Sequence, residues 1–193
     1  MNTDLLYPEI VIAGCGNPAY ADDGFGPAVV EELNKLLLPD NVRVVDAGLC
    51  GPQFIFTLLD PKMTRKLIII DSMDFGAKPG MITLLRPRDF PEGCIRDSHT
   101  GGILESLGQI NPEIEVILIG CQPQVVTSTE LTPGLSEEVL TSVPRAVRIV
   151  MELIHARHCT ADQKAESAGP LTKSRIRSAK TSIPTEYSHT HLG

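Results

Sequence analysis

The chain has no tryptophan, few aromatic residues and more acidic than basic side chains. Of its 193 residues, 4% are aromatic, and 17 Lys and Arg residues stand against 24 Asp and Glu residues, which gives a formal net charge of −7. A nucleic-acid-binding surface needs clustered basic side chains, commonly with aromatic rings on which bases stack. The composition therefore excludes nucleic acid as an expected partner.

Long apolar runs are also missing. No stretch reaches the ~20 consecutive apolar residues that a transmembrane helix requires, so no membrane partner is expected. The N-terminal segment MNTDLLYPEIVIAG lacks the basic start, apolar middle and small-residue cleavage site of a secretory signal. The five cysteines are odd in number and form no C-x-x-C pair, which argues against a disulfide framework or a zinc knuckle. We expect a cytoplasmic protein with reduced thiols.

The sequence contains short apolar runs that alternate with longer helical patterns. Strands are predicted at 9–14, 42–48, 66–71, 81–86 and 115–120, and helices at 26–37, 52–60, 102–109 and 136–156. The strand runs are rich in Ile and Val without polar alternation, which is typical of parallel strands that helices cover on both faces. The predicted fold is α/β, a three-layer sandwich with a mostly parallel twisted sheet of about five strands and helices on both faces.

The composition changes near residue 157. Residues 157–193 hold six Lys or Arg residues and three Asp or Glu residues, and are rich in Ser, Thr and Ala. Such a segment has little apolar surface to bury. We therefore predict a single α/β domain at 1–156 and a basic, flexible tail at 157–193.

The stretch GCGNPAYADDGFGP, which spans residues 14–27, follows the first predicted strand. Gly14, Gly16 and Ala19 match the G-x-G-x-x-A pattern of dinucleotide-binding sites, and Asp46 ends the second predicted strand, where a ribose-binding acid would stand. This pattern favours a dinucleotide-dependent oxidoreductase.

The two acids in the same stretch point to another chemistry. Asp22 and Asp23 lie where a bound pyrophosphate needs positive potential, and Pro18 falls inside the turn. One acid can cap the following helix, which is the role we expect for Asp22. The second acid, Asp23, then remains for another role.

Two further residues are candidates to join Asp23. In an open parallel sheet, ligands bind beyond the carboxyl ends of the strands, and Asp71 ends the strand at 66–71 on what we expect to be a solvent-accessible rim. His99 is the only histidine in the first 150 residues and precedes a predicted helix. If the three side chains converge, two carboxylates and one imidazole form an open site for nickel or zinc.

Four segments, in this order, resemble the hydrogenase maturation endopeptidases, which remove a short C-terminal extension from the large subunit of nickel-iron hydrogenases after nickel insertion. They are GCGNPAYADDGFGPAVVEEL, LIIIDSMDFGAKPG, DSHTGG and GCQPQVVTSTELTPGLSEEV, and the resemblance covers residues 9 to about 155. The opening segment and the DFGAKPG loop are similar to the archaeal-type members that process deazaflavin-reducing hydrogenases.

The resemblance implies that Asp23, Asp71 and His99 are the metal-contacting and catalytic residues, with Asp23 where some members have Glu. Gly16 and Asn17 then shape the opening loop. The implied metal is nickel supplied by the substrate and bound transiently, with no permanent cofactor. The implied partner is the precursor of the large subunit, and the protein is expected to be a monomer.

The reaction step leaves alternatives open. Either the metal as a Lewis acid or Asp71 and Asp23 as bases could activate the attacking water. Two other functions also stay open on the sequence alone. One is the dinucleotide-dependent oxidoreductase, and the other is a non-catalytic chaperone that binds the immature hydrogenase subunit without shortening it.

Overall fold

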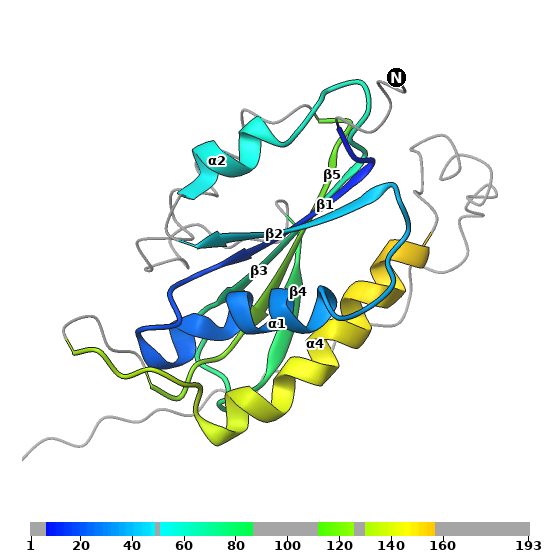
Figure 1. Cartoon of the computed structure of the whole chain (residues 1–193). Coiled ribbons are helices and arrows are strands. Elements are labelled where there is room, and N and C mark those ends of the chain that lie inside the picture. The colour runs from blue at the N-terminus through cyan, green and yellow to red at the C-terminus, as the bar shows by residue number, and fades with distance from the viewer. Residues whose placement is uncertain (1–6, 49–50, 87–111, 126–129, 157–193) are drawn as a thin grey trace, which may run out of the picture. The chain divides into compact units, whose positions relative to one another are not determined.

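The computed structural model describes residues 7–48, 51–86, 112–125 and 130–156, and the elements in these ranges form one five-stranded sheet with helices packed on it (Figure 1). The strands are β1 (Ile10–Cys15), β2 (Val42–Gly48), β3 (Lys66–Ser72), β4 (Ile82–Leu85) and β5 (Glu115–Cys121). The helices are the short 3₁₀ turn η2 (Ala21–Gly24), α1 (Phe25–Leu33), α2 (Gly51–Thr57) and α4 (Glu137–His155). All five predicted strands and three of the four predicted helices are confirmed. The predicted helix at 102–109 and the tail at 157–193 lie outside the described residues.

The strand order across the sheet is β2-β1-β3-β5-β4. The neighbouring strands β2, β1, β3 and β5 run parallel to one another, and β4 pairs antiparallel with β5. The central strands β1, β3 and β5 are buried almost throughout, as their apolar runs predict. The edge strand β2 is only partly buried, because one of its sides has no neighbouring strand. The prediction of a mostly parallel sheet is confirmed.

Helices cover both faces of this sheet. Figure 1 shows α1 and α4 on one face and α2 on the other. Phe25, Val29 and Leu33 of α1 pack with Val143 and Val150 of α4 in the core on the first face. A second cluster, which includes Ile55 of α2, fills the opposite face. The structure is therefore the three-layer sandwich predicted from the sequence.

The start of α1 lies very close to the carboxyl ends of two neighbouring strands. A Cβ atom added to Gly26 would collide with the backbone carbonyl oxygens of Cys15 in β1 and Ile70 in β3. Glycine is required here because any side chain would push the helix off the sheet. This close approach places the loop before α1 directly over the edge where parallel strands end. None of the helices in the described residues is both long and apolar enough to cross a bilayer.

Candidate active site

The loop between β1 and α1 holds the carboxylate of Asp23 in a defined position. Gly16 has φ +109, a conformation that glycine adopts without the steric cost other residues incur. The backbone N–H of Asn17 donates a hydrogen bond to Asp23 Oδ2 at 2.7 Å, and Asn17 Oδ1 accepts one from the backbone N–H of Ala19 at 3.0 Å. Gly16 and Asn17 thus shape the loop around Asp23.

The same geometry is incompatible with a phosphate-binding loop. The Asn17 N–H already donates to a carboxylate, which would repel a pyrophosphate. A Cβ on Gly14 would collide with the backbone of Gly26, so Gly14 serves helix packing. Asp46 Oδ1 accepts a hydrogen bond from the backbone N–H of Gly48 at 2.9 Å. The dinucleotide interpretation of this loop is therefore wrong.

Asp22 connects three segments of the chain. Its side chain is completely buried. Oδ1 accepts a hydrogen bond from the Ser136 N–H at 2.7 Å, and Oδ2 accepts from the Gln124 N–H at 2.8 Å, the Val125 N–H at 2.8 Å and Ser136 Oγ at 2.9 Å. The predicted cap on the helix that follows Asp22 is wrong, because neither η2 nor α1 has a side-chain cap. Asp22 instead ties the Asp23 turn to the exit of β5 and the entry of α4.

Asp71 lies next to this turn, at the carboxyl end of β3. Its exposed fraction is only 1%, so the expected solvent-accessible position is wrong. The reason is that β3 continues to Ser72, and Asp71 still pairs with Gly120 of β5. Ser72 Oγ lies 3.5 Å from Asp23 Oδ1, which brings the end of β3 to the Asp23 loop.

The pKa of the buried Cys15 thiol is affected by carboxylates of this part of the fold. Its pKa is raised far above the ordinary value, first because burial disfavours the thiolate and then because Asp71, Asp46 and Asp23 add negative potential. Asp23 and Asp71, which are 48 positions apart in the sequence, therefore both help to raise the pKa of one thiol. The fold brings the loop of Asp23 to the end of the strand that carries Asp71, and the predicted joint role of the two residues stays a prediction.

Gln122 orders the loop that follows β3, and sequence reasoning did not single it out. Its Oε1 accepts hydrogen bonds from the backbone N–H groups of Phe75 at 2.9 Å and Ala77 at 3.1 Å, and its Nε2 donates to Asp74 Oδ1 at 3.0 Å. The hydrogen bond from Gln122 is the main reason why the pKa of Asp74 is lowered. A polar residue directly after the apolar run of β5 was the available signal.

The comparisons with known proteins add the family. Residues 27–153 match the family model described as hydrogenase maturation protease. The chain belongs to the hydrogenase maturation protease family. The protease is 40% identical over 146 residues to a putative hydrogenase maturation protease of Methanocaldococcus jannaschii, a match that covers 74% of this chain and 94% of the relative. It is 34% identical over 150 residues to the coenzyme F420 hydrogenase subunit delta of Methanothermobacter thermautotrophicus, with 76% and 94% covered.

A solved structure agrees with this placement. The hydrogenase maturating endopeptidase HybD from Escherichia coli superposes with a TM-score of 0.65 at 25% identity, and the match covers 76% of this chain and 91% of that one. Members of the family are peptidases, so the protease is a hydrolase that acts on peptide bonds. The family therefore supports a peptidase over the oxidoreductase and the non-catalytic chaperone that the sequence left open.

The third predicted site residue of the protease, His99, lies outside the described residues. Among the residues that the structure describes, no three His, Cys, Asp or Glu side chains are grouped so that they could hold a metal ion. The predicted trio contains His99, and its geometry stays a prediction.

We predict that Cys15 of the protease is chemically inert in the folded state. Iodoacetamide at about pH 8 reacts with the thiolate, and the folded site suppresses this form. Peptide mapping by mass spectrometry after brief alkylation is expected to find Cys15 unmodified in native protein and modified in urea. Rapid modification of Cys15 in the native protein would contradict the buried position.

The Cys15 thiol is also expected to make the free energy of unfolding depend on pH. The folded pKa is raised above the ordinary value of 9.0, so the unfolded chain loses this proton first as pH rises. The contribution of Cys15 to the free energy of unfolding is thus complete below that value and declines above it. In Cys15→Ala, the decline of stability at alkaline pH is expected to be smaller than in the wild type.

Proposed function

We propose that the protease removes the C-terminal extension of a nickel-iron hydrogenase large-subunit precursor after nickel insertion, and that the nickel in this precursor is the recognition element. The observation that carries the proposal is the approach of the Asp23 carboxylate to the end of β3, where Ser72 Oγ, next to Asp71 in the chain, lies 3.5 Å from Asp23 Oδ1 at the edge where the parallel strands end. Two carboxylates attract a metal ion electrostatically, so this edge of the sheet is suited to a cationic group of the substrate.

In this proposal the nickel ion belongs to the substrate. Asp23, Asp71 and His99 supply two carboxylates and one imidazole, and the cysteines of the precursor supply the remaining ligands. The protease then has no resident metal and no permanent cofactor. Cleavage requires nickel to be present, because the ion is what places the extension beside the carboxylates.

Peptide hydrolysis also needs an activated water. We assign the proton transfer to the carboxylates, with Asp71 or Asp23 accepting a proton as the water oxygen bonds to the scissile carbonyl carbon. The C–N bond breaks, and the leaving amine takes up a proton. We do not assign nucleophilic attack to Cys15, because its thiol is buried and its raised pKa disfavours the thiolate.

The expected substrate belongs to the archaeal, deazaflavin-reducing type of hydrogenase. The similarity to a protein named coenzyme F420 hydrogenase subunit delta supports this assignment, since coenzyme F420 is a deazaflavin. We further propose that the protease acts as a monomer in the cytoplasm. The free thiols of Cys15 and Cys121 fit a reducing compartment.

The test compares nickel-loaded with nickel-free precursor. The wild-type protease is expected to shorten only the loaded precursor, as seen by intact mass. We expect His99→Ala to lose the preference for loaded precursor in a binding assay, because the imidazole is assigned to the metal. Nickel added to the isolated protease is expected to bind weakly, since three ligands without a thiolate form an incomplete set.

Several outcomes would contradict the proposal. Shortening of nickel-free precursor at the same rate would remove nickel as the recognition element. A stoichiometric nickel ion that remains in the protease through treatment with a chelator would show a resident cofactor. Binding by His99→Ala that still depends on nickel would refute the role of His99.

A further inference from the structure

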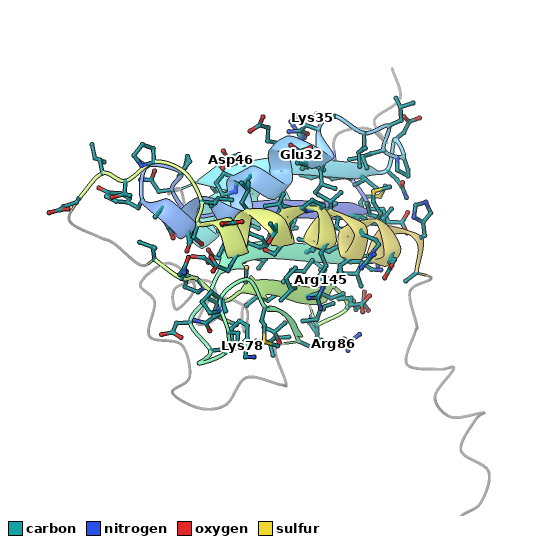
Figure 2. All side chains as sticks on the ribbon, turned by 90° about the horizontal axis from the view of Figure 1, so that it is seen from below. Glu32, Lys35, Asp46, Lys78, Arg86 and Arg145 are labelled. Carbon is teal, nitrogen blue, oxygen red and sulfur yellow. The ribbon has the colours of Figure 1, made fainter. Side chains whose placement is uncertain are left out.

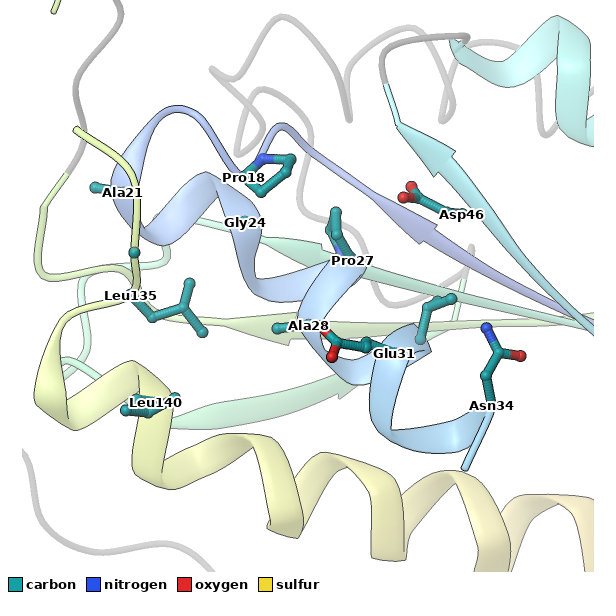
Figure 3. A pocket seen from close by; sticks show the side chains of 12 residues that line it. Pro18, Ala21, Gly24, Pro27, Ala28, Glu31, Asn34, Asp46, Leu135 and Leu140 are labelled. Carbon is teal, nitrogen blue, oxygen red and sulfur yellow. The ribbon is translucent and has the colours of Figure 1, made fainter. Parts of the chain in front are cut away.

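An open groove lies beside the turn that carries Asp23 (Figure 3). Its volume is about 520 Å³, within the range of roughly 300–1,000 Å³ that is typical of ligand sites. The lining residues are Pro18, Ala21, Gly24, Pro27, Ala28, Val30, Glu31, Asn34, Asp46, Gly134, Leu135 and Leu140. We call it the α1 groove, because half of its lining comes from this helix and its first flanking residues.

Most of the α1 groove is apolar. Figure 3 shows Leu135, from the loop before α4, extending toward Ala28 of α1, with Pro27 on the same helix. Leu140, in the first turns of α4, leaves 57% of its surface exposed. Small residues on α1 beside larger ones at the α4 entry produce a hollow that suits an apolar side chain of a partner.

The charged lining residues of the groove are acids. Glu31 and Asp46 are both exposed, and none of the lining residues that the structure describes is Lys or Arg. Lys35 pairs with both acids at this end of α1, but its Nζ lies 3.4 Å from Glu31 and 2.7 Å from Glu32, so it is closer to the acid outside the groove. Figure 2 shows Lys78 and Arg86 on the opposite side from Asp46 and Glu32, with Arg145 between them. The groove therefore favours a partner that presents a basic group.

We propose that the α1 groove binds an extended segment of the hydrogenase precursor in which apolar side chains stand beside a basic one. This inference rests on the proposed function. Ala21 and Gly24, which belong to the same short turn as Asp23, line the groove, so a segment bound there lies beside the turn that carries the Asp23 carboxylate. A second copy of the protease is a poor occupant, because it presents the same acids and two such surfaces repel each other.

The apolar part of the groove is tested by one matched pair of variants. Leu140→Ser removes an exposed leucine that lines the groove, and Leu37→Ser removes an exposed leucine that does not. With nickel-loaded precursor as the probe, Leu140→Ser is expected to raise KM about tenfold and leave kcat within about twofold. Leu37→Ser is expected to leave both constants within about twofold of the wild type.

The charged part of the groove offers a second pair. Glu31 and Glu32 are neighbouring exposed acids on α1 that both pair with Lys35, and only Glu31 lines the groove. Glu31→Lys is expected to raise KM about fivefold at low ionic strength, with a smaller effect at high salt. The same charge reversal in Glu32→Lys is expected to raise KM by less than about twofold.

The outcomes separate this inference from the proposed function. If the wild-type protease does not shorten the precursor, the proposed function fails. If it does, and the groove variants have the same KM as their controls, the groove inference alone is overturned. A lower KM in Leu140→Ser would also overturn it, because the groove would then be covered by a segment of the protease itself. A change of oligomeric state on Leu140→Ser, seen by sedimentation, would identify a second copy as the occupant.

Discussion

Asp71→Asn is expected to lower kcat for precursor processing by about a hundredfold or more. The substitution keeps the size of the side chain but removes the negative charge that we assign to the metal or to the attacking water. Asp74→Asn is the matched control, because Asp74 lies three positions further along the chain and is exposed. Its carboxylate faces Gln122 and Gly76. The control is expected to process the precursor at close to the normal rate.

Because Asp71 is buried, its substitution affects stability as well as activity. With an exposed fraction of 1%, the carboxylate is part of the packed end of β3, so Asn is also expected to lower the free energy of unfolding by about 1–3 kcal/mol. Circular dichroism and urea unfolding establish whether the variant is folded under assay conditions. A hundredfold loss in a fully folded variant supports the catalytic role. Normal processing by Asp71→Asn would refute that role even though the family placement stands.

The fold could be predicted from the sequence because its determinants are local. Strands such as Ile10–Cys15 and Glu115–Cys121 are apolar along their length, and this pattern occurs where both faces of a sheet are covered. The amphipathic pattern of α4 likewise required only neighbouring residues. The edge position of β2 could not be predicted, since burial on an edge depends on which strand ends up beside it.

The site was less predictable because its contacts are long-range. Asp71 was expected on a solvent-accessible rim, but it is buried inside β3, where its backbone pairs with Gly120 in a strand more than 40 positions away. Gln122 contacts the loop after β3 across a separation of 45 to 48 positions. The meeting of the Asp23 loop with the end of β3 could be predicted only through the rule that parallel strands end at a common edge.

Asp22 shows the same limit most clearly. A local pattern of an acid before a helix predicted a cap on that helix, yet the hydrogen-bond donors lie 102 to 114 positions further along the chain. The first peptide groups of α1 compete for the carboxylate with donors that only folding brings near. Those donors prevail because each reaches the buried carboxylate at 2.7–2.9 Å.

The second large effect is therefore expected from Asp22→Ala, as a loss of stability. The substitution removes the acceptor for three backbone N–H groups and one hydroxyl, all directed at a completely buried side chain. A buried donor without a partner costs about 1–3 kcal/mol, so we expect the free energy of unfolding to fall by about 3 kcal/mol or more. Urea unfolding followed by circular dichroism measures this loss.

Two control variants locate the cause of that loss. Ser136→Ala removes only the hydroxyl donor and is expected to cost about 1 kcal/mol. Asp23→Ala removes the neighbouring carboxylate, which accepts from the Asn17 N–H and lies near Ser72 Oγ. We expect it to lower the free energy of unfolding by a similarly small amount, about 1 kcal/mol. We also expect it to abolish processing. If Asp22→Ala were no less stable than Asp23→Ala, the two adjacent acids could not be divided into a structural and a reactive one. The expected contrast assigns stability to Asp22 and chemistry to Asp23, because the first carboxylate is buried with four donors inside the protein and the second is partly exposed and is the one that we propose to contact the substrate.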